Sequence, residues 1–141
     1  MTENEPRARV GTSGWNKPPW RKNFHPPGLV QRRELEYAAE RYATLEINTT
    51  FHGFPRPSSY LSWIAETPDD LIFSVKGNKS VTHDNSLMNP ARNVAEFFAS
   101  GVLRLAEKRG PILWQTPPSL PFHRETVEPF LAALPHSVSE A

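Results

Sequence analysis

Cysteine is absent from the sequence, and its absence excludes a disulfide framework, a thiolate metal site and a cysteine nucleophile. Long apolar runs are also missing, because no stretch approaches the roughly 20 residues that a membrane-spanning helix needs. The first nine residues, MTENEPRAR, contain no apolar segment of the kind found in signal peptides. We therefore expect a cytoplasmic protein that does not contact membranes.

An excess of charge of either sign is missing too, since the formal net charge is +1. Such a balance produces no broad field that would steer the protein toward nucleic acid. The short charged clusters at residues 21–22 and 32–34 are interpreted as solvated surface. The sequence also lacks the P-loop, G-x-G-x-x-G and G-x-S-x-G patterns, and we expect no cofactor.

The histidines give little support for a metal site. His25, His52, His83 and Glu46 carry the nitrogen and oxygen donors that a metal at one barrel mouth would need. No H-x-H or H-E-x-x-H spacing is present, however. We therefore expect no metal site.

Proline is abundant, and its fifteen residues punctuate the chain between periodic stretches. Those stretches predict strands that alternate with amphipathic helices. The strands are expected at 9–13, 44–49, 71–76 and 112–115, and the helices at 31–42, 58–66, 91–109 and 127–134, where Pro129 fits only the first turn. A chain of 141 residues is about one domain, expected at 9–135, between a flexible N-terminus at 1–8 and a tail at 136–141.

The order strand–helix, repeated four times, predicts a parallel sheet, because right-handed crossovers return the chain to the same direction. Apolar and polar residues alternate along the strands: Leu45 and Ile47 oppose Glu46 and Asn48. In an open parallel sheet both faces are covered and the strands read as continuous apolar runs. One apolar face and one face that becomes polar toward the strand ends instead predict a TIM-like (β/α) barrel.

Four motifs occur in order: VGTSGWNKPPW, LEINTTF, FSVKGN followed by VTH, and GPILWQTPPSLPF. Together they closely resemble the YecE-like family, a domain of unknown function, from about residue 9 to residue 134. The resemblance implies a TIM-like barrel. Two positions depart from it, since His25 and His52 stand where family members usually have tyrosine.

The family's barrel normally continues well past this point, and a barrel of this kind typically needs about 250 residues. The chain has room for about four β-α units, a partial barrel with unpaired strands at both edges. Two interpretations stay open: a truncated product, which we favour because the final residues PHSVSEA do not resemble a cap, or self-association of two copies through the open edges.

Polar residues near the ends of the strands form the candidate site, because barrel enzymes place their catalytic groups there. Glu46 is the candidate acid or base, Lys76 the charge stabiliser and His83 the proton donor. The candidate substrate-binding residues are Ser13, Trp15, Asn48 and Gln115. An ion pair between Glu46 and Lys76 is expected across neighbouring strands. The alternatives are a structural ion pair, a surface histidine and a simple turn in which Trp15 plugs the barrel.

Three functions are compatible with these residues. The first is a barrel enzyme that processes a small anionic molecule or phosphate ester. The second is a nucleic-acid-binding module with a rim of aromatic and basic residues, namely Trp15, Trp20, Phe24, Phe51, Arg21, Lys22, Lys76 and Lys79. The third is a truncated remnant without function. Fold alone does not choose among them.

Overall fold

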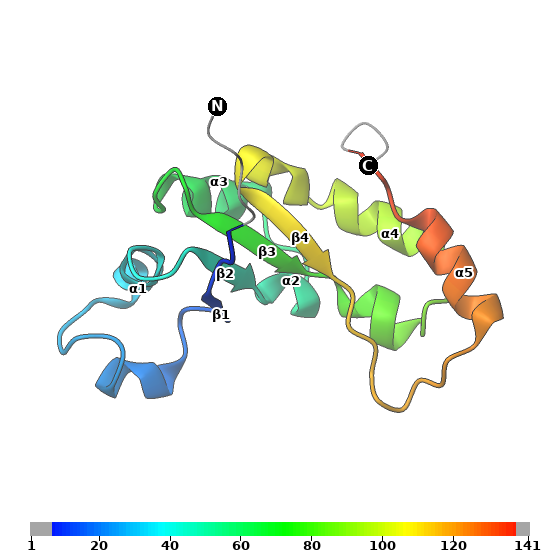
Figure 1. Ribbon diagram of the computed structural model, residues 1–141, viewed down its shortest axis with the longest axis horizontal. Coiled ribbons are helices and arrows are strands. Elements are labelled where there is room, and N and C mark those ends of the chain that lie inside the picture. The colour runs from blue at the N-terminus through cyan, green and yellow to red at the C-terminus, as the bar shows by residue number, and fades with distance from the viewer. Residues whose placement is uncertain (1–6, 138–141) are drawn as a thin grey trace.

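A computed structural model describes residues 7–137 of the chain. Its centre is a four-stranded sheet in which each strand pairs in parallel with the next strand of the sequence, in the order β1-β2-β3-β4 (Figure 1). The strands are β1 (Gly11–Ser13), β2 (Thr44–Ile47), β3 (Ile72–Lys76) and β4 (Arg109–Leu113). This order is the one a (β/α) barrel requires, and the predicted partial barrel is confirmed.

Helical segments follow every strand. The α-helices are α1 (Glu34–Ala39), α2 (Thr49–His52), α3 (Pro57–Ala65), α4 (Pro90–Ala99) and α5 (Arg124–Ala133). The other helical segments are the 3₁₀ turns η1 (Pro18–Lys22), η2 (Gln31–Arg33) and η4 (Val102–Lys108) and the π-helical turn η3 (Ser80–Asp84). No helix within residues 7–137 is long and apolar enough to cross a membrane.

The two faces of the sheet differ as the alternation of the sequence predicts. Leu45, Ile47 and Phe73 are completely buried beneath the helices. Glu46 and Lys76 lie on the other face and are only half-buried. In a closed barrel this second face would line the interior. Within residues 7–137 no further strand covers it.

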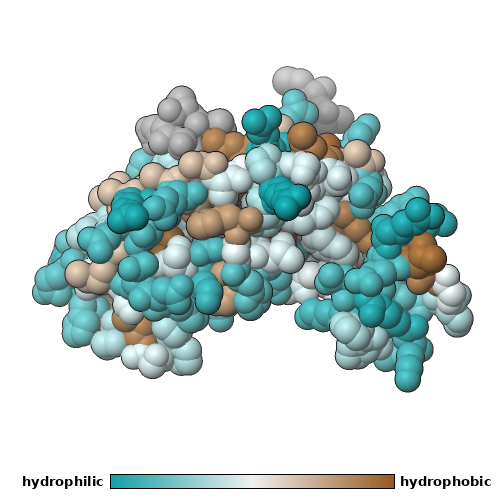
Figure 2. Space-filling model, turned by 180° about the vertical axis from the view of Figure 1, so that it is seen from behind, coloured by the Kyte–Doolittle hydropathy of each residue, from teal (hydrophilic) through white to brown (hydrophobic). Residues whose placement is uncertain are grey.

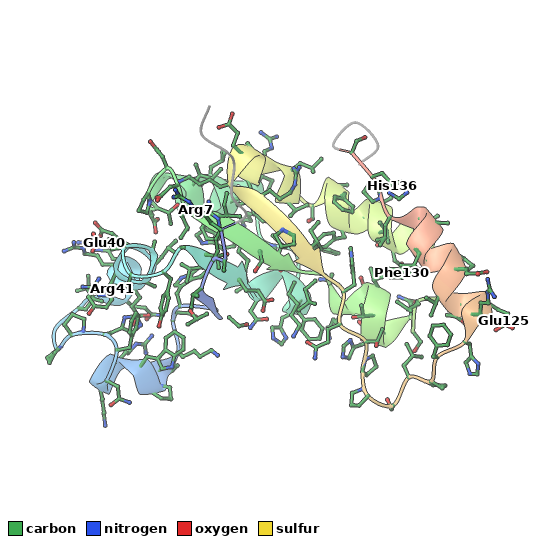
Figure 3. All side chains as sticks on the ribbon, viewed as in Figure 1. Arg7, Glu40, Arg41, Glu125, Phe130 and His136 are labelled. Atoms are coloured by element: carbon green, nitrogen blue, oxygen red, sulfur yellow. The ribbon has the colours of Figure 1, made fainter. Side chains whose placement is uncertain are left out.

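The contact between the sheet and the last two helices is built around Trp114. Its ring lies 5.1 Å from that of Phe97 on α4 and 5.7 Å from that of Phe130 on α5, measured between centroids. Phe130 projects from α5 toward α4 in Figure 3. Gly77 follows β3 beneath the indole, where any Cβ atom would overlap the Trp114 ring. Glycine at this position therefore lets the tryptophan lie flat against the end of the sheet.

The predicted continuous helix at 91–109 is wrong. α4 ends at Ala99, and Gly101 has φ = 121°, a conformation that side chains rarely adopt. Helical spacing of buried residues continues past the break because η4 buries Val102 and Leu105. β4 accordingly starts at Arg109, earlier than the predicted 112–115.

The prediction that Pro129 lies in the first turn of the last helix is also wrong. α5 begins at Arg124, so Pro129 is its sixth residue and not part of its first turn. The expected flexible N-terminus falls mostly outside the described residues, as do the last four residues of the expected tail.

Candidate functional site

Three predicted site residues form a hydrogen-bonded chain on the polar face. β1 and β2 pair so that Ser13 lies opposite Glu46. The Ser13 hydroxyl donates to Glu46 Oε1 at 2.6 Å, and Asn48 Nδ2 donates to Ser13 Oγ at 2.7 Å. Hydroxyl-to-carboxylate bonds of this length are strong because the acceptor is charged.

The second carboxylate oxygen of Glu46 is uncommitted. Only Oε1 accepts a hydrogen bond from the side chains and backbone of residues 7–137. Ser13 and Asn48 hold the carboxylate in one orientation while Oε2 stays available on the open face. Such a group can take a proton from a water molecule or a ligand hydroxyl.

The expected ion pair between Glu46 and Lys76 is wrong. Glu46 lies opposite Ser74, so Lys76 projects one pleat further along β3. Its ammonium instead lies 4.5 Å from the centroid of the Phe51 ring, a cation–π contact. Within the described residues the Lys76 ammonium has neither a hydrogen bond nor an ion pair.

The Phe51 ring contacts three basic side chains, those of Lys76, His52 and His83. α2 starts directly after β2, and the Thr50 hydroxyl in α2 donates to the Lys76 carbonyl at 2.7 Å. The Phe51 ring lies 5.0 Å from both the His52 and the His83 rings, which approach it edge to face. His83 Nδ1 is 2.8 Å from the Thr82 hydroxyl. Lys76, His52 and His83 therefore contact one aromatic ring, which belongs to the helix that begins one residue after Asn48.

Phe51 and His52 are not among the predicted catalytic or substrate-binding residues, since Phe51 is assigned only to the rim of the nucleic-acid alternative and His52 is considered only as a metal ligand. The sequence holds a signal for them, because both follow a strand within five residues at the end where barrel sites lie. Neither the cation–π contact nor the edge-to-face packing can be derived from spacing alone.

Trp15 lies on the other side of the sheet. Its ring contacts those of Trp63 and Phe73, at 5.7 and 6.2 Å between centroids, and belongs to the layer beneath the helices. This placement corresponds to the structural alternative and separates Trp15 from the polar chain. Gln115 is exposed two residues beyond β4, and its side chain makes no hydrogen bond within residues 7–137.

His25 is buried at a distance from the other histidines. It is 2% exposed, its Nε2 lies 3.0 Å from the Trp15 carbonyl, and the rings of Trp20, Phe24 and Tyr37 surround it. No three His, Asp or Glu side chains in the described part of the chain come together to hold a metal ion.

Arg21 is not free to bind a ligand. It donates to the buried carboxylate of Glu34 at 2.7 Å, and this hydrogen bond raises the pKa of the guanidinium. Because Glu34 is only 1% exposed, it needs this cation as its partner. The pair fixes η1 against the start of α1.

The loop after η3 borders a small hollow at the same end of the sheet. Ser86, Leu87 and Asn89 all have positive φ, which is strained for residues other than glycine. A cavity of about 280 Å³ lies between this loop and residues 116–127, lined mainly by apolar side chains. The Ser86 hydroxyl donates to the His83 carbonyl at 3.4 Å, so the loop is joined to the site.

A family model described as "Protein of unknown function DUF72" matches residues 9–141. The chain belongs to the DUF72 family. The predicted YecE-like resemblance is confirmed by the relatives: the chain is 28% identical over 127 residues to the UPF0759 protein YecE of Escherichia coli K12 and 22% identical over 123 residues to YunF of Bacillus subtilis.

These DUF72 relatives are much longer than the chain. The matches cover 89% and 84% of the chain but only 44% and 43% of YecE and YunF. Two crystal structures of the DUF72 protein EF0366 from Enterococcus faecalis superpose with TM-scores of 0.66 and 0.60, at 16% identity. They cover 88% of the chain and 44% and 45% of EF0366. The likeness establishes a shared fold, and the chain spans less than half the length of these proteins.

Proposed function

We propose that the polar face at the C-terminal ends of the strands binds a small phosphate ester and hydrolyses it. The observation that supports this proposal is the Lys76 ammonium, which no carboxylate neutralises within residues 7–137. A half-buried cation with only an aromatic ring as its partner favours an anionic ligand. Barrels of this kind also frequently bind phosphate at this end of the sheet.

The groups around Lys76 suit the reaction. Lys76 would neutralise the phosphoryl oxygens, and Oε2 of Glu46 would take the proton from the attacking water as the new P–O bond forms. His83 would donate a proton to the leaving alkoxide as the ester P–O bond breaks. The products are an alcohol and inorganic phosphate, so atoms and charge balance without a further reactant.

Phosphate binding to the intact chain provides the first test. Titration with inorganic phosphate, followed by isothermal calorimetry, should show saturable binding that Lys76→Met weakens at least tenfold. Lys79→Met is the matched control, because Lys79 is three residues away and exposed. Equal affinity in the parent and in Lys76→Met would overturn the assignment of the site.

Hydrolysis is tested separately from binding. Glu46→Gln keeps the hydrogen-bond acceptor for Ser13 but cannot take the proton, so it should retain phosphate and lose turnover of p-nitrophenyl phosphate. Native mass spectrometry of the purified parent would identify any anion that co-purifies. A parent that binds phosphate but hydrolyses no ester would reduce the proposal to a binding site.

The aromatic residues favour a small ligand over nucleic acid. Trp20 and Phe24 pack around His25, Trp15 packs beneath the helices, and only Phe51 lies at the polar site. A strand-binding platform needs successive exposed rings. Nucleic-acid binding that falls steeply with rising salt would favour the module instead.

A further inference from the structure

A cavity lies beside the helices that follow the first two strands, away from the polar face. It has a volume of about 470 Å³ and is bordered by η2, the start of α1 and the C-terminal end of α3. Pockets that bind small molecules usually have volumes of about 300–1,000 Å³. All of its lining residues lie between residues 15 and 66, in the first two β-α units. The cavity therefore has the size of a ligand site.

Two tryptophans form the apolar wall of this cavity. The rings of Trp15 and Trp63 lie 5.7 Å apart between centroids and meet edge to face at 77°. Behind them, Phe73 lies 6.2 Å from Trp15 and Tyr60 lies 5.2 Å from Trp63, and both of these rings are completely buried. Because buried rings hold the indoles in place, a ligand would meet a rigid apolar corner that needs no ordering on binding.

A buried histidine holds the backbone beside this corner. His25 Nε2 lies 3.0 Å from the Trp15 carbonyl, and a carbonyl can only accept, so Nε2 carries the proton. This hydrogen bond ties the segment after β1 to the ring cluster around His25. It thereby fixes the positions of Trp15 and of the next residue, Asn16.

Four polar side chains of the cavity have no partner within residues 7–137. They are exposed and form neither a side-chain hydrogen bond nor an ion pair: Asn16, Gln31, Arg32 and Glu66. Arg32 and Glu66 carry opposite charges in the same cavity but do not pair with each other. The neighbouring Arg33, by contrast, pairs with Glu36 at 2.9 Å. The cavity thus presents uncommitted donors and acceptors next to an apolar corner.

This combination of groups favours a neutral ligand with several hydroxyl groups. A hydroxyl both donates and accepts, and the amides of Asn16 and Gln31 do the same, whereas Arg32 only donates and Glu66 only accepts. An anion would meet the Glu66 carboxylate and a cation would meet the Arg32 guanidinium. A wholly apolar ligand would remove water from these groups without replacing its hydrogen bonds.

We propose that this cavity binds a saccharide of one or two rings. The C–H face of a sugar ring would pack against the corner of Trp15 and Trp63, since the faces of aromatic rings are negative and C–H groups are weakly positive. The sugar hydroxyls would bond to the four uncommitted side chains. Other apolar residues do not offer such a corner on the face of the molecule that Figure 2 shows, where they are scattered among hydrophilic ones.

Saturation-transfer NMR on the intact chain tests this proposal, with glucose, mannose, galactose, maltose and cellobiose as the probes. At least one of them should bind saturably in the millimolar range. Arg32→Ala should weaken that binding about fivefold, the effect of losing one hydrogen bond. Arg33→Ala is the matched control, because Arg33 is the exposed neighbour that does not line the cavity, and its affinity should equal that of the parent. Absence of binding at tens of millimolar, or equal affinity in the two variants, would overturn the proposal.

Charge dependence distinguishes a saccharide from an amino acid, whose ammonium and carboxylate would pair with Glu66 and Arg32. Glu66→Gln keeps a hydrogen-bond acceptor, so saccharide affinity should stay within about twofold of the parent. It should also be unaffected by rising ionic strength. Binding of phenylalanine but of no sugar, lost in Glu66→Gln and at high salt, would refute the saccharide. None of these probes carries phosphate, so failure of the phosphate-ester proposal would leave the result unchanged.

Discussion

Replacing Lys108 with methionine should destabilise the fold strongly. Lys108 is 8% exposed, and its ammonium donates to the carbonyls of Ile64 and Thr67 at 2.9 Å each and to the Thr67 hydroxyl at 3.0 Å. These acceptors lie at the C-terminal end of α3 (Pro57–Ala65), where helix carbonyls have no partner within the helix and attract cations. Lys108 therefore caps α3 from the residue that precedes β4.

The magnitude follows from the three bonds that are lost. A hydrogen bond to a charged group contributes about 1.5–3 kcal/mol net, but methionine also removes the cost of burying the charge. We expect a loss of about 2–4 kcal/mol in the free energy of unfolding, or roughly 10 °C in Tm for a chain of this length. Methionine has nearly the same length, so cavity formation adds little.

Urea unfolding followed by circular dichroism at 25 °C measures this loss. The slope of the free energy against urea should be the same in parent and variant, so that the change in midpoint reports stability alone. Lys79→Met, at an exposed position, should unfold within about 0.5 kcal/mol of the parent. A Lys108→Met variant as stable as the parent would show that the three bonds contribute nothing net, and the capping role would be refuted.

Three further changes have definite expected results. Gly77→Ala should cost about 1–3 kcal/mol, because the new methyl group overlaps the Trp114 ring; urea unfolding with the midpoint unchanged would contradict this packing. Burial raises the pKa of Tyr60, so the unfolded chain loses this proton first and stability should fall as pH rises above about 10. Tyr60→Phe should flatten that part of the stability–pH curve, and an unchanged slope would exclude Tyr60 as its cause. Phe51→Leu removes the ring between Lys76 and His83 and should weaken phosphate binding several-fold by calorimetry.

The sequence predicts the sheet well because strand periodicity is local. Alternation along residues 44–48 and 71–76 is sufficient to assign each side chain to a face, and the structure buries Leu45, Ile47 and Phe73 as expected. The same alternation places Glu46 and Asn48 on one face, and the structure joins both by hydrogen bonds to Ser13, which is predicted from its place at the end of the first strand.

The errors arise where the outcome depends on register or on a single backbone conformation. Lys76 has the charge to pair with Glu46, but the pairing of β2 with β3 gives Ser74 that position. Helical spacing persists through residues 91–109 because both sides of the break bury apolar residues, whereas the backbone leaves the helical conformation at Gly101 and again at Ala106. Neither fact is encoded in residue spacing.

Because the tryptophans pack in different parts of the sheet, their fluorescence can report the unfolding of each part. Trp15 and Trp63 lie edge to face under the first half of the sheet, whereas Trp114 lies between the sheet and the last two helices. Replacing Trp114 by phenylalanine leaves emission from the N-terminal half, and replacing Trp15, Trp20 and Trp63 leaves emission from Trp114 alone. Comparison of the two emission signals during unfolding would show whether both halves of the sheet melt as one cooperative unit.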